Sequence, residues 1–356
     1  MEIGSEFWID KNKVIHESDL LPSWLSRFGD VVLTSSGRGA LGLLLNQLKP
    51  KNNKALLPSY ICESVIHSFI IAGYELIYYD IDKYLIPIDI EFIKNSDVGI
   101  FFHMGYFGFL TNDILADIIL CLKAESVITI EDVTHVLFSK YNKQTESDFV
   151  VGSIRKWFGI PSGGFLASDK IMRYELLDVN VEFINMRRSS LHQKFEYMKS
   201  RNESIKDTFL SGFNRAEHML DEDIKPYKID HESEMIIKNL DYIELQSNRQ
   251  RNYKFLLKHL RDVDGIEVIF NDLKSDVTPM FFPIYVKSKR DELRRKLIES
   301  EIYCPVHWPI PKHVNGQLNI TTENVYDSIL SIPCDQRYQI EDMSRIINEI
   351  VSFFEE

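Results

Sequence analysis

Short apolar runs alternate with helical segments over the first two-thirds of the chain. Each run is apolar at nearly every position and rich in β-branched residues, which is typical of strands covered on both faces. Helical spacing lies between several runs, for example at 40–48, 62–72 and 114–124. This order predicts an α/β fold with a mostly parallel central sheet flanked by helices. The predicted strands are 31–34, 54–58, 75–80, 98–103, 126–131, 148–153 and 165–168.

The pattern changes beyond residue 180. Residues 181–246 are mostly helical and charged, and a long helical pattern runs from 233 to 260. We therefore predict a large α/β domain at 1–245 and a smaller α+β domain at 246–356. The smaller domain is expected to contain a strand at 280–286, a helix at 291–299, a strand-like segment at 302–306 and a closing helix at 340–354.

The chain carries 41 Lys and Arg against 53 Asp and Glu, a formal net charge of −12. Nucleic acid repels so acidic a protein, so we expect no nucleic-acid partner. The longest apolar stretch, at 98–122, contains His103, Asp113 and Asp117, which argues against a membrane span. The four scattered cysteines have no metal-ligand spacing and fit reduced thiols. With no apolar signal segment, these features predict a cytoplasmic protein that acts on small molecules.

A turn rich in glycine and serine follows the first predicted strand. Ser36, Gly37, Arg38 and Gly39 lie between that strand and the next helical segment. Backbone N–H groups at a helix N-terminus, where glycine permits close approach, can bind a phosphate group. The alternative is a strand–helix turn in which Ser36 caps the helix.

Asp132 stands where the predicted strand at 126–131 ends, and His135 follows three residues later. In an open α/β sheet, ligands bind at the carboxyl ends of the strands. A carboxylate there would hold a protonated ring nitrogen in its charged form, because an opposite charge in a dry site favours ionisation. His135 can donate a hydrogen bond to a ring hydroxyl. The alternatives are a helix cap for Asp132 and a structural role for His135.

Lys156 follows the apolar strand at 148–153 and precedes two aromatic residues. Burial would lower the pKa of its amine and make the amine nucleophilic toward a carbonyl. Ser153 and Lys156 also share the Ser-x-x-Lys spacing of serine acyl enzymes. Those enzymes place the motif at the start of a helix, for which the nearby Pro161 leaves little room. A glycine-rich loop containing Tyr106 either lines the same pocket or forms a tight turn.

Together these segments predict a site for pyridoxal 5′-phosphate (PLP). The turn at 36–39 would hold the phosphate, Asp132 would keep the pyridine nitrogen protonated, and Lys156 would form the Schiff base. Each signal alone is weak, but they follow one another on successive strand ends. We therefore expect a PLP-dependent enzyme, and first of all an aminotransferase with Lys156 as its catalytic residue.

The same segments resemble the DegT/DnrJ family of fold-type I PLP enzymes, best known as nucleotide-sugar aminotransferases. The resemblance extends from about Leu33 to the C-terminal helix. It implies a fold-type I PLP transferase architecture and a homodimer that builds each site from two chains. The segments that carry it are 36–41, 56–60, 131–135, 153–156 followed by Gly163 and Gly164, and 302–308.

The resemblance also implies roles for individual residues. Ser153 is expected to contact the cofactor. Cys62 stands where many members have the aromatic residue that stacks on the cofactor ring, and Tyr60 is the alternative stacking residue. Tyr106 and His307 are expected to contact the substrate. Arg38 replaces a small residue of the family's phosphate loop, which marks the chain as a divergent member.

The implied reaction transfers an amino group from an amino acid, with glutamate the expected donor, to a keto substrate. A nucleotide-linked keto-sugar of polysaccharide or surface-glycan biosynthesis is the expected acceptor. Two alternatives stay open: another PLP-dependent reaction on the same fold, and a PLP-binding regulatory protein without turnover. Arg337, in a polar loop before the last helix, is a candidate clamp for a substrate carboxylate or phosphate. The alternative is an ion pair of Arg337 with Asp335 or Glu341.

Overall fold

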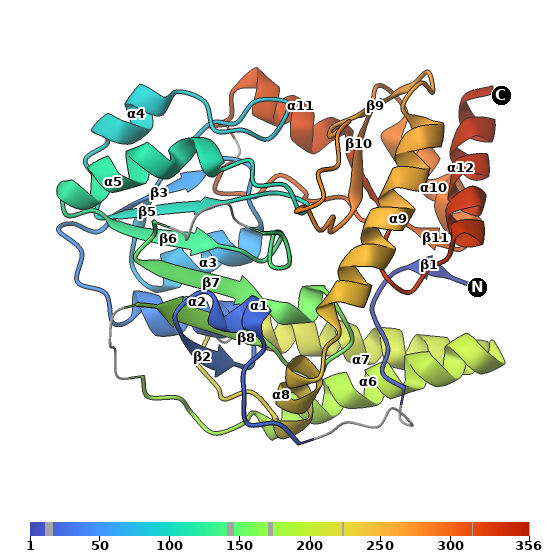
Figure 1. Ribbon diagram of the computed structural model, residues 1–356, viewed down its shortest axis with the longest axis horizontal. Coiled ribbons are helices and arrows are strands. Elements are labelled where there is room, and N and C mark those ends of the chain that lie inside the picture. The colour runs from blue at the N-terminus through green and yellow to red at the C-terminus, as the bar shows by residue number, and fades with distance from the viewer. Residues whose placement is uncertain (11–16, 141–145, 170–173, 223, 315, 356) are drawn as a thin grey trace.

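A computed structural model of the chain describes residues 1–10, 17–140, 146–169, 174–222, 224–314 and 316–355. A seven-stranded sheet forms its centre, in the order β2-β8-β7-β6-β5-β3-β4 (Figure 1). Strand β8 runs antiparallel to its neighbours β2 and β7, and the other neighbouring strands are parallel. The predicted α/β fold with a mostly parallel sheet is confirmed. The strands are β2 (Asp30–Thr34), β3 (Lys54–Pro58), β4 (Glu75–Tyr79), β5 (Ile100–Met104), β6 (Ile128–Asp132), β7 (Phe149–Ser153) and β8 (Gly164–Ser168).

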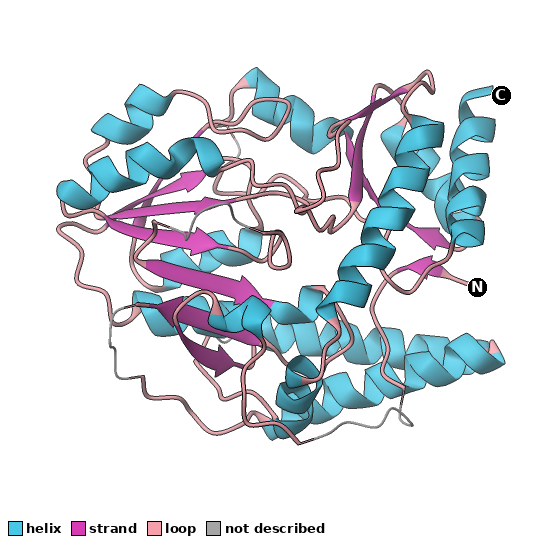
Figure 2. Ribbon diagram, viewed as in Figure 1, coloured by secondary structure: helices cyan, strands magenta, loops and turns pink. Residues whose placement is uncertain are grey.

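Helices cover both faces of this sheet (Figure 2). They are α2 (Gly37–Leu45) and α3 (Glu63–Ile71) on one face, and α4 (Ile90–Asn95), the short turn η1 (Asp113–Leu115) and α5 (Ala116–Ala124) on the other. Leu57 and Phe102 pack with α2 and α3, whereas their neighbours Leu56 and Phe101 pack with α4 and α5. Successive strand residues point to opposite faces, so both faces must be apolar. The continuous apolar runs of the sequence have this cause.

A long helical hairpin follows β8 at the β2 end of the sheet (Figure 1). It consists of α6 (Val181–Ser200) and α7 (Glu203–Glu222), and the single-turn helix α1 (Ser23–Ser26) precedes β2. Leu191 on α6 packs against Phe209 and Phe213 on α7. Farther along the hairpin, Phe183 packs against Leu220. The predicted helical character of this charged region is thus observed.

The helical pattern expected at 233–260 is interrupted. The chain forms two helices, α8 (His231–Lys238) and α9 (Tyr242–Leu260). Asp241 caps α9, because its carboxylate accepts a hydrogen bond from the Glu244 amide at 2.9 Å. An aspartate followed three residues later by a glutamate is a helix-start signal, and it outweighs the apolar spacing that runs across it.

The C-terminal part contains a smaller sheet in the order β12-β10-β9, antiparallel throughout. Its elements are β9 (Ile266–Val268), β10 (Phe282–Val286), α10 (Arg290–Glu299), β11 (Ile302–Tyr303), α11 (Ile320–Ser328), β12 (Ile329–Ile332) and α12 (Ile340–Glu355). The N-terminal strand β1 (Ile3–Gly4) pairs in parallel with β11. Residue 245, the expected domain boundary, lies inside α9. The division into domains 1–245 and 246–356 stays a prediction.

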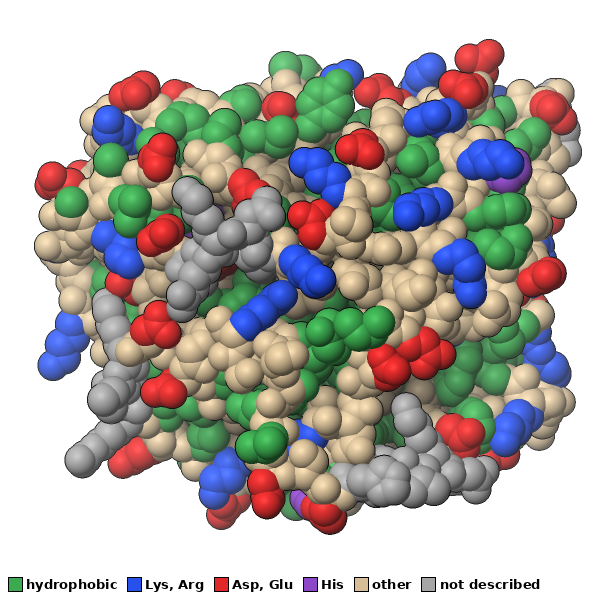
Figure 3. All heavy atoms as spheres, in the orientation of Figure 1, with side chains coloured by type: hydrophobic (Ala, Val, Ile, Leu, Met, Phe, Trp, Pro, Cys, Tyr) green, Lys and Arg blue, Asp and Glu red, His purple; other side chains and the backbone are tan. Residues whose placement is uncertain are grey.

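Within the described residues, no helix is both long and apolar enough to cross a membrane. On the face that Figure 3 shows, acidic and basic side chains are interspersed with apolar ones. The same described ranges contain no group of three or more His, Cys, Asp or Glu side chains placed to hold a metal ion.

Candidate active site

A cavity of about 510 Å³ lies at the carboxyl ends of the central strands. Its walls come from the N-terminus of α2, the start of α3, the ends of β6 and β7, and the segment after β11. Nine of the residues singled out from the sequence line it together: Ser36, Gly37, Arg38, Cys62, Asp132, His135, Ser153, Lys156 and His307. Their convergence follows from the topology, because parallel strands bring their carboxyl ends to one edge of the sheet.

The turn before α2 forms one end of the cavity. Ser36 caps α2, since its Oγ accepts a hydrogen bond from the Gly39 amide at 3.0 Å, and Gly39 itself does not line the cavity. Strand β8 passes very close to this turn. A Cβ on Gly164 would lie 2.1 Å from the Ser36 carbonyl carbon, so only glycine fits there. Gly37 has no side chain and lines the cavity, so the first turn of α2 presents its backbone there, as an anion site requires.

Asp132 is the last residue of β6 and is 9% exposed. Its Oδ1 accepts a hydrogen bond from the Thr134 amide at 2.7 Å. Burial raises the pKa of Asp132 to about 6, against the lowering effect of the hydrogen bonds from Thr134. No ion pair of Asp132 occurs among the residues that the structure describes. A cationic ring nitrogen at this position would favour the ionised carboxylate.

His135 and His307 both line the cavity, and their rings meet edge-on with centroids 5.8 Å apart. Burial lowers the pKa of His135 to about 3, helped by the nearby positive charge of Lys156, and burial also holds the pKa of His307 low. Both rings are thus neutral at pH 7. The Phe107 amide donates to His135 Nδ1 at 3.4 Å, which leaves the proton on Nε2. His135 can therefore donate a hydrogen bond from Nε2.

Lys156 ends the short turn η2 (Ile154–Lys156) that follows β7. Contrary to the expectation of a buried amine, its side chain is exposed at the cavity, whereas Trp157 beside it is fully buried. Trp157 takes the interior position, because its indole nitrogen donates to the Thr134 carbonyl at 2.7 Å. The lysine backbone is therefore fixed while its side chain reaches the cavity.

Tyr60 and Tyr106 are placed differently from the expectation. Neither lines the cavity, and both are almost completely buried. The Tyr106 hydroxyl donates to the Tyr60 carbonyl at 2.6 Å, and the Tyr60 ring packs against Trp308 at 5.2 Å. Tyr60 thus lies behind Trp308, and Trp308 is the aromatic residue that reaches the cavity. Cys62 lines the cavity at the N-terminus of α3.

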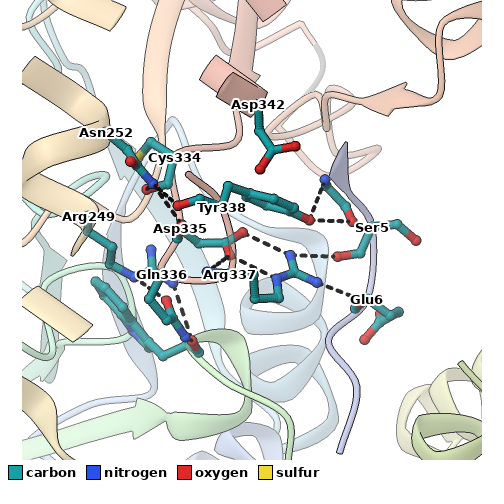
Figure 4. Close-up of polar contacts among 12 residues, drawn as sticks. Ser5, Glu6, Arg249, Asn252, Cys334, Asp335, Gln336, Arg337, Tyr338 and Asp342 are labelled. Atoms are coloured by element: carbon teal, nitrogen blue, oxygen red, sulfur yellow. Dashed lines mark hydrogen bonds and ion pairs between the residues drawn. The ribbon is translucent and has the colours of Figure 1, made fainter. Parts of the chain in front are cut away.

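Arg337 lies outside this cavity, in the polar network of Figure 4. Its Nε and Nη2 both donate to the carboxylate of Asp335 at 2.8 Å. Its Nη1 donates to the Glu6 carbonyl at 2.9 Å, and its guanidinium lies 4.1 Å from the Phe7 ring centroid. The ion pair with Asp335, the alternative to a substrate clamp, is the arrangement found. Arg337 is therefore not part of the proposed site.

Sequence reasoning missed several residues that line the cavity, among them Glu63, His67, Thr134, Arg155 and Trp308. Trp308 was within the quoted C-terminal segment, and its position beside a candidate histidine was the available signal. Arg155 precedes the candidate lysine, but nothing in the sequence shows that it is buried. Glu63 and His67 lie one helical turn apart on α3, which is a spacing shared by ordinary surface helices.

The C-terminal part of the chain carries a family signature. Residues 230–351 match the sequence model of the DegT/DnrJ/EryC1/StrS aminotransferase family. This C-terminal part of the chain is therefore similar in sequence to that family. The match begins at the N-cap of α8 and includes His307, but it stops short of the segments that contain Lys156, Asp132 and the α2 turn. No curated sequence matches the chain.

Solved structures share the fold of the chain over nearly its whole length. Aminotransferase TlmJ from Streptoalloteichus hindustanus has a TM-score of 0.66 at 16% identity, covering 92% of this chain and 88% of TlmJ. Sugar aminotransferase CalS13 from Micromonospora echinospora has a TM-score of 0.64 at 17% identity, covering 92% and 89%. Helicobacter pylori PseC, an aminotransferase involved in the biosynthesis of pseudoaminic acid, has a TM-score of 0.64 at 16% identity, covering 93% and 89%.

The family is that of PLP-dependent transaminases, so the predicted enzyme class and cofactor are confirmed. The residues of the cavity fit PLP on chemical grounds. The N-terminus of α2 suits a phosphate, and the buried carboxyl of Asp132, which has no ion pair among the described residues, suits a ring nitrogen that carries a proton. Among the described residues, Lys156 is the one lysine that lines this cavity. The roles of the individual residues remain proposals.

Proposed function

We propose that this aminotransferase uses Lys156 as its catalytic residue and transfers an amino group from glutamate to a nucleotide-linked keto-sugar. The observation that supports this most is the convergence of Lys156, Asp132 and the α2 N-terminus on one cavity. The sugar substrate is supported by the family and by fold relatives described as sugar aminotransferases. A role in surface-glycan synthesis, a homodimer and a cytoplasmic location belong to the same proposal.

PLP, when bound, supplies an electron-withdrawing ring that stabilises negative charge on the carbon bearing the amino group. The Asp132 carboxylate would hold the proton on the ring nitrogen. His135 would donate from Nε2 to the ring oxygen, and the first turn of α2 with Ser36 and Ser153 would hold the phosphate. These contacts would fix the orientation of the ring relative to Lys156.

Lys156 carries the proton in both halves of the reaction. With PLP bound, its free Nζ would take a proton from the α-carbon of the amino donor and pass it to the cofactor, and the second half would return a proton to the carbon that receives the amino group. The exposure of the side chain suits this movement, because the amine must swing between two positions while its backbone stays fixed. Trp308 and His307 also line the cavity, from the segment after β11.

Lys156→Ala should abolish amino transfer, with a loss of at least about 10³-fold in rate. Borohydride reduction of the loaded wild type, followed by peptide mass spectrometry, should find the cofactor on Lys156. Lys94→Ala, an exposed lysine on α4, is the matched control and should keep full rate and labelling. Full transaminase turnover by Lys156→Ala would refute the assignment.

The acceptor and the alternative chemistries are tested together. Glutamate alone should convert the bound cofactor to its pyridoxamine form, which absorbs at shorter wavelength, and a nucleotide-linked keto-sugar should reverse the change. No conversion with any amino donor would favour a PLP-binding regulatory protein. Decarboxylation, elimination or aldol products would instead favour another PLP reaction on this fold.

A further inference from the structure

Three arginines from three separate segments converge on one carboxylate. Arg38 in the first turn of α2, Arg155 next to Lys156, and Arg187 on α6 all approach Glu217 on α7. Arg155 binds Glu217 with both terminal nitrogens, Nη2 donating to Oε2 at 3.0 Å. Arg38 Nη2 donates to the same Oε2 at 2.9 Å. Glu217 thus joins the helical hairpin to the α2 turn and to the lysine segment.

The acceptors in this cluster do not satisfy all of its donors. Arg155 and Arg187 are only 8% and 2% exposed. Within the described part of the chain, Nε of Arg155 and Nε of Arg187 have no hydrogen-bond partner, and Nη1 of Arg187 has only ion pairs, with Glu6 at 3.5 Å and Glu217 at 3.6 Å. Buried guanidinium N–H groups without acceptors are costly, so their presence calls for an explanation. Arg155 also lines the cavity, so an anion there would be a further acceptor for the N–H groups of its terminal nitrogens.

Arg155 lines the cavity at its anion-binding end. Ser36, Gly37, Arg38, Ser153 and Arg155 line the cavity, together with Asp221, whose carboxylate is paired with Arg38. A Cβ on Gly37 would lie 3.1 Å from the Ser153 Cβ, so the α2 turn and the lysine segment are in direct contact. The helix N-terminus and the incompletely satisfied guanidinium of Arg155 therefore border the same space. Two independent features favour an anion at this place.

We propose that Glu217 is a positioning residue for the cofactor phosphate, acting through Arg155 and Arg38. The carboxylate fixes the two guanidiniums beside the α2 turn, and a phosphate held at that turn becomes an acceptor for their remaining N–H groups. This inference rests on the proposed function, because it takes the anion to be the phosphate of PLP. It replaces the small phosphate-loop residue of the family with a charged clamp anchored on α7.

The clamp, which consists of Arg38, Arg155 and Glu217, is already formed before a phosphate binds. Glu217 and Asp221 together offset the charges of Arg38 and Arg155, with Asp221 also paired to Arg38. The guanidiniums are therefore ordered before the phosphate arrives, so little conformational entropy is lost when it binds. Without Glu217 the same cations would remain, but they would have to be ordered by the phosphate itself.

The test compares two cofactor forms that differ only in the phosphate. Apoprotein is titrated with PLP and with pyridoxal, and binding is followed by absorbance. Glu217→Gln keeps the shape of the side chain and removes its charge. We expect the Kd for PLP to rise about tenfold, a free-energy change of about 1.4 kcal/mol, while the Kd for pyridoxal is unchanged. Asp207→Asn, an exposed carboxylate on the same helix, is the control and should alter neither value.

Arg155→Lys provides a second variant, because it keeps the charge but loses the two-pronged contact with Glu217. It should show the same phosphate-selective loss, so the idea stays testable if Glu217→Gln does not fold. An equal loss for PLP and pyridoxal in both variants, or no loss in either, would overturn the clamp. Failure of the wild type to bind PLP would instead overturn the proposed function.

Discussion

At the scale of one residue, the buried carboxyl of Asp132 lowers the free energy of unfolding of the apoprotein at neutral pH. The carboxyl was found from sequence because it ends a strand, but its pKa depends on burial, which a single sequence does not reveal. Its folded-state pKa of about 6 lies above the ordinary value of 3.8. The folded apoprotein therefore keeps a proton that the unfolded chain releases. This contribution to stability is complete below pH 3.8 and is lost as the pH rises through about 6.

Asp132→Asn should remove this loss. We expect the variant apoprotein to be more stable than the wild type at pH 7.5 by up to about 3 kcal/mol, with the advantage shrinking toward pH 4. Urea unfolding of both apoproteins at several pH values measures the difference. In the loaded enzyme the same change should weaken PLP binding and activity. If the stability difference did not vary between pH 4 and 7.5, the raised pKa of Asp132 would be wrong.

At the scale of single elements, the strands were predictable and the close approaches between them were not. The buried strands of the sheet read as apolar runs because both faces are covered. The break between α8 and α9 also had a signal, the Asp241 cap with Glu244, which the apolar spacing obscured. The contact between β8 and the α2 turn had no such signal. Gly163 and Gly164 indicate a close approach, but the sequence does not show which segment approaches them.

Gly164→Ala should therefore disturb β8 more than its small size suggests. Its Cβ would lie within 2.4 Å of the backbone at both Ser36 and Gly37, and backbone cannot move aside as a side chain does. We expect the free energy of unfolding to fall by about 2–4 kcal/mol, together with weaker PLP binding. Gly73→Ala, whose Cβ would meet nothing within 4 Å despite a positive φ, should cost only about 1 kcal/mol. Equal losses in both variants would contradict the steric argument.

At the scale of the whole molecule, one buried arginine ties the lysine segment to the C-terminal part. Arg249 on α9 donates to the carbonyls of Trp157, Pro279 and Met280, and its guanidinium lies 4.6 Å from the Trp157 ring centroid. Gln336 also donates to the Trp157 carbonyl, at 2.8 Å. Sequence reasoning placed Lys156 at a strand end but could not find these contacts, because they join positions about 90 and 180 residues apart.

Arg249→Met should lower the free energy of unfolding by about 3 kcal/mol, because it leaves several buried carbonyls without donors. Since the contact holds the backbone beside Lys156, the amino-transfer rate should fall as well. Thermal unfolding and steady-state rates of the loaded enzyme measure the two effects. Arg261→Met, an exposed arginine just after the same helix, is the control and should change stability by less than about 0.5 kcal/mol.

The pairing of β1 with β11 affects how the chain is made. Ile3 is synthesised about 300 residues before its partner Ile302, so at ordinary translation speeds it waits roughly 15 to 60 s for that partner to leave the ribosome. The central sheet needs residues only as far as Ser168 and can form in the meantime. During that interval Ile3, which the finished fold buries completely, is open to chaperones and to neighbouring nascent chains. Closing of the N-terminal strand is then a late step that reports completion of the C-terminal part.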